Sequence, residues 1–167
     1  HRGLRGAGGR CGTRGRAVSE GGGDTGGAGE LGQISIDYEG PVANSGVPGA
    51  IEAYVGQRFL SKYARRTLAH QPESLAHVIA LEQKSKITPL VLSIAALKGD
   101  QPSSDVLSWA GAKLGFALGS AINLLDIRNV VVGGGVSGAG EFILGPAREA
   151  VRKSVTPSMR GNVQIVQ

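Results

Sequence analysis

At residues 130–143 the chain reads VVVGGGVSGAGEFI, a run of valines followed directly by a glycine-rich loop. The valines predict a short buried strand, and the glycines predict a tight loop that leads into a helix over about residues 142–154. Residues 163–166 predict a further strand. This order of strand, loop, helix and strand is typical of an α/β layer with parallel strands.

The same loop carries a spacing that is found in nucleotide-binding proteins. Gly133, Gly135 and Gly138 match G-x-G-x-x-G, and a strand precedes them as that pattern requires. Glycines at these positions let the backbone approach a phosphate or a ribose, and the N-terminus of the following helix favours an anion. On spacing alone, the loop is either a nucleotide-binding loop or a purely structural tight turn.

Residues 33–68 predict a strand, a turn and a helix. Ile34, Ile36 and Tyr38 alternate with polar residues, which is typical of a strand with one buried face. A turn follows at residues 39–41. The helix expected over about residues 50–68 has an apolar stripe. Its members are Ile51, Val55, Phe59 and Tyr63.

Three more helices are predicted before the valine strand. Ser74 is a good N-cap for the first, and Thr88-Pro89 is a good start for the second. The third is expected to open at Ser103 or Ser104 and to run to about residue 125. It carries a stripe of small residues, which predicts the close approach of another element. The stripe consists of Gly111, Gly115 and Gly119.

Composition argues against a disulfide-bonded, secreted or membrane-spanning protein. The single cysteine excludes an internal disulfide. No stretch is both apolar and long enough to span a bilayer, and the first residues lack the pattern of a signal peptide. A cytoplasmic protein without a membrane partner is therefore predicted. Because the chain begins at His1, we expect it to be a fragment.

The net charge of +5 lies mainly in the first part of the chain. Residues 1–29 hold five Arg against two acidic residues, together with 12 of the 28 glycines. Such a segment buries too little surface to offset the entropy cost of ordering it. Residues 1–28 are therefore expected to be disordered, or to be an aberrant reading of the coding DNA. The rest of the chain is nearly neutral and gives no sign of DNA binding.

Two glutamates flank the loop at residues 39–49. A carboxylate at a strand entrance, such as Glu30, and another in the first turn of a helix, such as Glu52, can converge in a cleft and bind hydroxyl groups. Alternatively, Glu52 only favours its helix N-terminus and Glu30 is a surface residue. On the residues alone the second interpretation is favoured.

Several of these motifs, in their order, resemble the ROK family of repressors and sugar kinases. The family pattern GE-x-GH is similar to GELGQ at residues 29–33, and C-x-C-G-x-x-G-C-x-E is similar to ANSGVPGAIE at residues 43–52. The order continues with four further motifs. They are ITP at 87–89, AALKGD at 95–100, INLLDI at 122–127 and VVVGGGVS at 130–137.

The resemblance implies that residues 29–167 are the C-terminal lobe of a ROK-type sugar kinase. The expected fold is α/β, an incomplete domain of the actin-like ATPase (ribonuclease H-like) type, with a mixed sheet and packed helices. The expected activity is glucokinase-like transfer of phosphoryl from Mg-ATP to a hexose or N-acetylhexosamine hydroxyl. The alternatives are a sugar-responsive repressor, which requires an N-terminal helix-turn-helix to bind DNA, and an inactive sugar-binding homologue. A homo-oligomer is also expected.

The resemblance also assigns residues. Glu30, Gln33 and Glu52 would bind the sugar, and a glycine loop would bind the nucleotide. The residues of that loop are Gly133, Gly134, Gly135, Val136 and Ser137. ATP and Mg²⁺ are the implied cofactors.

The chain departs from the family pattern in two places. The family holds a zinc ion with one His and three Cys, and the corresponding residues here are Gln33, Ala43, Ser45 and Ala50. None of them supplies an imidazole or a thiolate, so we predict no zinc and no other metal ligand in the chain. No residue matches the family's catalytic Asp. This chain alone is therefore expected to contain no catalytic residue and to be inactive.

Overall fold

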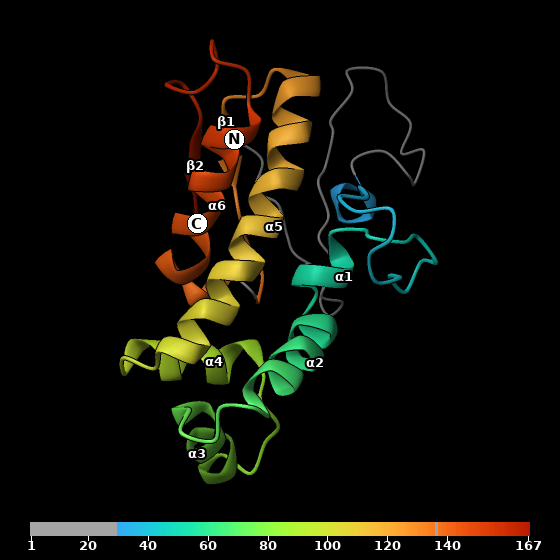
Figure 1. Cartoon of the computed structure of the whole chain (residues 1–167). Helices are drawn as coiled ribbons and strands as arrows, with labels where there is room; N and C mark the ends of the chain where they lie inside the picture. Colours follow the sequence, from blue (N-terminus) through green and yellow to red (C-terminus); the bar gives the residue numbers. More distant parts are fainter. Residues whose placement is uncertain (1–29, 136) are drawn as a thin grey trace, which may run out of the picture.

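The computed structural model describes residues 30–135 and 137–167, which form a helix-rich α/β structure with one small sheet. Figure 1 shows the long helix α5 in the middle, with α6, β1 and β2 along one part of it and α1, α2 and α4 along the other. The elements in chain order are η1 (Leu31–Gln33), α1 (Glu52–Val55), α2 (Gln57–Leu68), α3 (Leu75–Glu82), α4 (Pro89–Leu97), α5 (Gln101–Leu125), β1 (Asn129–Val131), η2 (Ser137–Ala139), α6 (Glu141–Ser154) and β2 (Gln164–Val166).

The strand–loop–helix–strand unit is present as predicted. β1 and β2 pair in parallel, with Val130 opposite Ile165, and α6 makes the connection between them. The prediction that β1 is buried is wrong, because Val131 is 74% exposed. Within the described residues the sheet has two strands, both parallel, and is therefore smaller than the mixed sheet that was expected. Helices cover one face of it, so alternate strand residues remain open to solvent.

The glycine stripe of α5 lets α6 approach closely, as expected. A Cβ atom added to Gly111 would lie 2.3 Å from the carbonyl oxygen of Ile143, and one added to Gly115 would lie 2.3 Å from that of Ala147. No side chain fits at such distances. The two helices therefore pack backbone against backbone, and this contact ties the sheet unit to the rest of the molecule.

Helix starts follow the predicted caps in two of three cases. The Ser74 hydroxyl accepts a hydrogen bond from the amide of Ala76, and the Thr88 hydroxyl accepts one from the amide of Val91. The predicted start of α5 at Ser103 or Ser104 is wrong. Asp100 is the N-cap instead, because its carboxylate accepts the N–H of Ser103 at 3.1 Å.

The predicted strand over residues 33–38 is absent. Gln33 belongs to the short helix η1, and Ser35 forms only an isolated antiparallel bridge with Ala50. Tyr38 is 83% exposed, so the alternation of buried and exposed residues ends before it. The partner segment contains Pro48, which cannot donate a backbone hydrogen bond, and the pairing stays limited to single bridges.

The single helix expected over residues 50–68 is two helices. Gly56 has φ −58° and ψ 136°, which is extended backbone, and it separates α1 from α2. A Cβ atom at Gly56 would lie 2.5 Å from the carbonyl oxygen of Glu52. The break therefore depends on glycine, and it leaves Arg58, the second residue of α2, lining the same pocket as Glu52.

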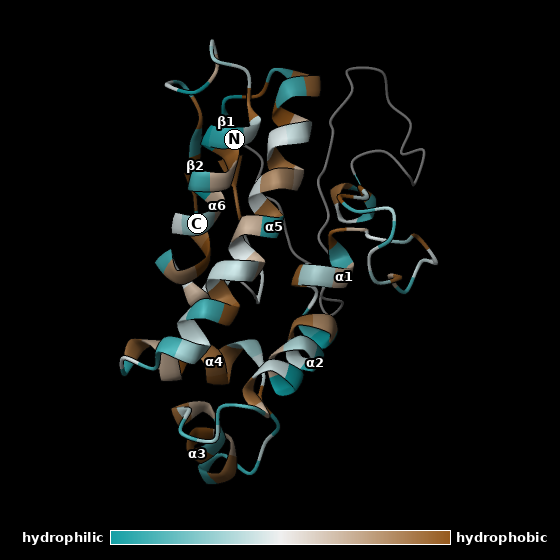
Figure 2. Cartoon of the chain, viewed as in Figure 1, coloured by the Kyte–Doolittle hydropathy of each residue, from teal (hydrophilic) through white to brown (hydrophobic). Residues whose placement is uncertain are grey.

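The apolar core surrounds α5, and a smaller second cluster lies under the loop before α1. Figure 2 shows α3 as mostly apolar and α2 as more polar. Some large apolar side chains on α3 and α4 are exposed, including Leu81 (78%) and Leu97 (76%). None of the helices within residues 30–135 and 137–167 is long and apolar enough to cross a membrane.

Candidate functional site

Two of the three predicted sugar-binding residues are in direct contact. The side-chain amide of Gln33, at the end of η1, donates a hydrogen bond from Nε2 to Oε2 of Glu52 at 3.2 Å. Glu52 is the first residue of α1, and both side chains are partly buried. The fold thus joins two residues that are 19 positions apart in the chain.

Glu30, the third predicted residue, lies in the same turn. Its carbonyl oxygen accepts the N–H of Gln33 at 3.0 Å, which closes the turn of η1. Its carboxylate makes no hydrogen bond to any residue that the structure describes. The backbone therefore holds Glu30 beside Gln33.

Ser45 extends the Gln33–Glu52 contact into the loop. Its hydroxyl donates a hydrogen bond to Oε1 of Gln33. The amide of Gln33 is then engaged on both sides, as an acceptor from Ser45 and as a donor to Glu52. The sequence marked Ser45 only as a position where a metal ligand is absent.

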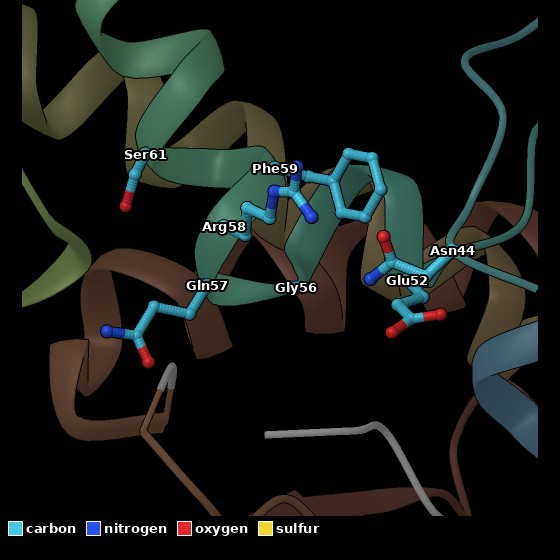
Figure 3. A pocket seen from close by; sticks show the side chains of 7 residues that line it. All are labelled: Asn44, Glu52, Gly56, Gln57, Arg58, Phe59 and Ser61. Atoms are coloured by element: carbon cyan, nitrogen blue, oxygen red, sulfur yellow. The ribbon is translucent and has the colours of Figure 1, made fainter. Parts of the chain in front are cut away.

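A pocket of about 300 Å³ lies next to Glu52. Figure 3 shows Arg58 extending toward Phe59, Asn44 and Glu52, whereas Gln57 points away from them. Gly56 and Ser61 complete the lining. A carboxylate, an amide, a guanidinium and an aromatic ring together can donate to, accept from and stack on a hydroxylated ring.

Sequence reasoning predicted one of the seven residues that line the pocket, Glu52, and missed the other six. Asn44 lies inside the motif at residues 43–52, and Arg58 and Phe59 follow it closely. Phe59 belongs to the apolar stripe that the sequence predicts for one continuous helix. A glycine inside an expected helix indicates a possible break. At Gly56 this break lets Arg58 and Phe59 line the same pocket as Glu52.

Tyr54 anchors the site to α5. Its hydroxyl donates to Oδ2 of Asp37 at 3.2 Å, and its ring lies 4.9 Å from Nζ of Lys113. Burial, with further contributions from the hydrogen bond and the charge of Asp37, raises the pKa of Tyr54. Trp109 of α5 stacks on Tyr63 at 3.7 Å between ring centroids and lies 5.7 Å from Tyr54. These contacts fix α1, and with it Glu52, on the core.

The glycine loop after β1 is open to solvent. Gly133, Gly134 and Gly135 are exposed, and a Cβ atom at any of them would meet no atom of the described residues within 4 Å. Gly134 has φ +92°, which favours glycine for conformational reasons. The hydroxyl of buried Ser137 donates to the carbonyl oxygen of Gly134 at 2.8 Å and fixes the turn.

Packing against the described residues therefore does not explain the other glycines of this loop. An exposed backbone with no side chains leaves room for a ligand to approach. The loop ends at Gly140, the N-cap of α6, which has φ +55° and no side-chain cap. Val136, also predicted to bind nucleotide, lies outside the described residues, as does the segment at residues 1–29.

The residues at the four zinc positions do not fit a zinc ion. Alanine has no ligand atom, and Gln33 and Ser45 offer only neutral oxygen and nitrogen, where structural zinc takes thiolate or imidazole. Ala43 and Ala50 are buried in the small cluster with Ala53, against Val47 and Phe59. Residues 30–135 and 137–167 contain no group of three or more His, Cys, Asp or Glu side chains that could hold a metal.

Comparison with known proteins identifies the family. The model described as "ROK family" matches residues 5–167. The chain belongs to the ROK family. The ROK match thus extends over both halves of the described structure, from the loop around Gln33 and Glu52 to the sheet.

The ROK relatives include both kinases and regulators. A glucokinase of Thermotoga maritima is 29% identical over 137 residues, which are 82% of this chain and 43% of that protein. The structure of a ROK family glucokinase from Streptomyces griseus in complex with glucose and AMPPNP is 30% identical and has a TM-score of 0.71, covering 83% of this chain and 45% of that one.

A ROK family transcriptional regulator, a homologue of the E. coli MLC protein, is equally similar in structure. It is 26% identical with a TM-score of 0.71, and the match covers 83% of this chain and 34% of that one. The chain thus spans less than half the length of each of these three relatives. At the level of the family, both sugar phosphorylation and regulation are represented among similar proteins.

Proposed function

We propose that this chain is the C-terminal part of an ATP-dependent hexose kinase. In this proposal Glu30, Gln33 and Glu52 bind hydroxyl groups of a hexose or N-acetylhexosamine beside α1, where Glu52 lines the pocket. The contact between Gln33 and Glu52 carries the proposal, because it orients a carboxylate at the edge of a 300 Å³ pocket. A carboxylate held by one donor retains lone pairs for ligand hydroxyls.

The fold assignment is part of the proposal. Residues 29–167 are proposed to form the C-terminal lobe of an actin-like ATPase fold, with residues 1–28 as a separate segment. The similarity to the Streptomyces griseus glucokinase supports this, since it covers 83% of the chain at a TM-score of 0.71. The protein is further proposed to act in the cytoplasm as a homo-oligomer.

The glycine loop is the proposed nucleotide site. Gly133 to Gly135 would present exposed backbone to the adenosine of ATP, with Val136 and Ser137 completing the site, and Ser137 holds the turn in place. Mg²⁺ would supply charge compensation on the ATP phosphates when bound. Zinc has no place in the proposal, because the four residues at its family positions do not fit it.

Regulation is the second candidate function. The structural similarity to the ROK transcriptional regulator supports it to the same degree, with a TM-score of 0.71 in both cases. No residue of this chain matches the family's catalytic Asp, which leaves an inactive sugar-binding protein as the third candidate. All three proposed functions include the sugar site. A kinase also needs a catalytic Asp, a repressor also needs a DNA-binding helix-turn-helix, and an inactive sugar-binding protein needs neither.

Two measurements test the proposal. Titration calorimetry of the 167-residue chain with glucose and with N-acetylglucosamine should detect binding, and Glu52→Gln should weaken it. Hexose-dependent ADP formation should then appear in the product of the complete reading frame and not in this chain alone. Binding without ADP formation in the complete product would favour the regulator or the inactive homologue, and DNA binding would separate those two. Absence of hexose binding would contradict all three.

A further inference from the structure

The side-chain amide of Gln33 is asymmetric, and the structure uses both of its ends. Oε1 accepts the hydroxyl hydrogen of Ser45, and Nε2 donates to Oε2 of Glu52 at 3.2 Å. A rotation of the amide by 180° would place its oxygen against the carboxylate of Glu52, and two acceptors would then repel each other. Glu52 thus selects the orientation of the amide, and Ser45 holds its far end.

The position of Ser45 is set by the backbone around it. Ser45 lies in a short turn in which the N–H of Gly46 donates to the carbonyl oxygen of Ala43, and the N–H of Ala43 donates to that of Val47, both at 3.0 Å. Gly46 has φ +88°, so the turn favours glycine at this position. An antiparallel bridge between Val42 and Pro48 closes the turn. The hydroxyl therefore reaches Gln33 from a preformed loop.

Apolar packing closes the space behind this contact. Ala43 and Ala50, at two of the four family zinc positions, are 5% and 0% exposed, and Val47 and Phe59 pack against them. The other two positions, Gln33 and Ser45, are joined by the hydrogen bond. A metal ion bound by all four would tie η1 to the loop. Here a hydrogen bond and a small apolar cluster make that connection.

We propose that Ser45 is a positioning residue of the sugar site, which acts through Gln33 on the carboxylate of Glu52 and takes over the connection that a metal makes elsewhere in the family. This proposal rests on the proposed sugar binding by Glu52. Without Ser45, the side chain of Gln33 loses one of its two hydrogen bonds and samples more conformations. Only some of these conformations still donate a hydrogen bond to Glu52. Hexose affinity then falls, since the ligand must restrict the carboxylate itself.

The first test compares matched hydroxyl variants by titration calorimetry of the 167-residue chain with glucose and N-acetylglucosamine. Ser45→Ala should raise Kd by about three- to tenfold, the effect of one intramolecular hydrogen bond. Ser45→Thr keeps the hydroxyl and should restore the affinity. Ser35→Ala is the control, because it removes a hydroxyl that donates to the carbonyl oxygen of Pro48 in the same loop without contacting Gln33.

The second test does not need a sugar. The side-chain NH₂ signals of Gln33 in ¹⁵N NMR spectra should shift and exchange faster with water in Ser45→Ala, and remain unchanged in Ser35→Ala. Metal analysis of the purified chain should find no zinc, and EDTA should not change Kd. If the wild-type chain binds no hexose while the Gln33 signals respond to Ser45→Ala, the proposed function fails and the Ser45–Gln33 link stands.

Three results would overturn the positioning role. One is an unchanged Kd together with unchanged Gln33 signals in Ser45→Ala. Another is an equal loss of affinity in Ser35→Ala and Ser45→Ala, which would show a general effect of the loop. The third is one zinc ion per chain, because the metal would then make the connection that is assigned here to Ser45.

Discussion

The hydroxyl group of Ser74 donates a hydrogen bond to Oδ2 of Asp100 at 2.8 Å, so one buried carboxylate joins the starts of α3 and α5. The same carboxylate accepts the N–H of Leu75 at 2.9 Å and that of Ser103 at 3.1 Å. Burial opposes the charge of Asp100, but hydrogen bonds from Ser103, Leu75 and Ser74 outweigh it and lower its pKa. Asp100 therefore links two helix N-termini as a charged group.

Replacing Asp100 should destabilise the chain. Asp100→Ala leaves donors of both helices without their acceptor and should lower the free energy of unfolding by about 2–3 kcal/mol. Asp105→Asn is the control, since Asp105 lies on the same helix but is exposed and, among the described residues, accepts only from Gln101. Urea unfolding at neutral pH measures both. A loss in Asp100→Ala no larger than in the control would contradict the linking role.

The lowered pKa of Asp100 also predicts a pH dependence. As the pH falls, the unfolded chain takes up a proton at the usual pKa of 3.8 before the folded chain does. The contribution of Asp100 is therefore complete above that pH and is lost as the pH falls through the lower pKa of the folded state. Between about pH 5 and pH 2, Asp100→Ala should lose stability less steeply than wild type. If stability falls with pH equally steeply in wild type and in Asp100→Ala, the lowered pKa of Asp100 is contradicted.

The packing of α5 on α6 predicts opposite effects for two glycines. Gly115→Ala places a Cβ 2.3 Å from a backbone oxygen of α6, so the helices must separate, at a cost of about 1–3 kcal/mol. Gly145 lies inside α6, and a Cβ there has its nearest neighbour at 3.7 Å. Gly145→Ala should therefore stabilise the chain, by up to about 1 kcal/mol. Thermal unfolding followed by circular dichroism measures the stability of both variants, and should show a decrease for Gly115→Ala and an increase for Gly145→Ala.

The pocket beside Glu52 predicts a role for Arg58. Arg58→Ala removes a charged donor from the pocket lining and should raise the Kd for hexose about tenfold. Arg66→Ala is matched in charge and lies exposed on the same helix, outside the pocket, and should leave Kd unchanged. Fluorescence of the single tryptophan, Trp109, can follow the titration, since its ring lies 5.7 Å from Tyr54 of α1. Equal effects of the two variants would exclude a specific role for the pocket.

The glycine loop predicts a separation of stability from nucleotide affinity. A Cβ atom at Gly133 would meet no atom of residues 30–135 and 137–167 within 4 Å, so Gly133→Val should leave the unfolding temperature unchanged. If ATP approaches this backbone, the same variant should weaken ATP binding in the product of the complete reading frame. Gly134→Val should lower both the stability and the ATP affinity. The loss of stability should be about 1–2 kcal/mol, because φ at Gly134 is +92°. ATP affinity unaffected by Gly133→Val would favour the purely structural turn.

Much of the helical framework followed from local signals. Ser74 and Thr88-Pro89 mark helix starts because a side-chain oxygen can satisfy a free backbone N–H within the same few residues. The glycines at 111, 115 and 119 marked the contact face of α5, because their spacing places them on one side of a helix. The family and the glycine loop could be recognised in the same way, from residues close together in the chain.

Signals that depend on distant partners gave wrong or incomplete predictions. Residues 33–38 alternate like a strand, but pairing needs a neighbour, and the segment around Pro48 offers only single bridges. Asp100 was not predicted as the cap of α5, although aspartate is a good N-cap. Its link to Ser74 spans 26 positions and exists only when α3 and α5 are packed together.

By itself the sequence determined the starts of α3 and α4, the parallel strand unit and the absence of His and Cys at residues 33, 43, 45 and 50. Only the tertiary structure decided what stands there instead, a hydrogen bond from Ser45 to Gln33 and from Gln33 to Glu52 over buried alanines. Helix caps and periodicity act over a few residues and can be read locally. A contact across 19 positions depends on the path of the loop between them, which packing sets.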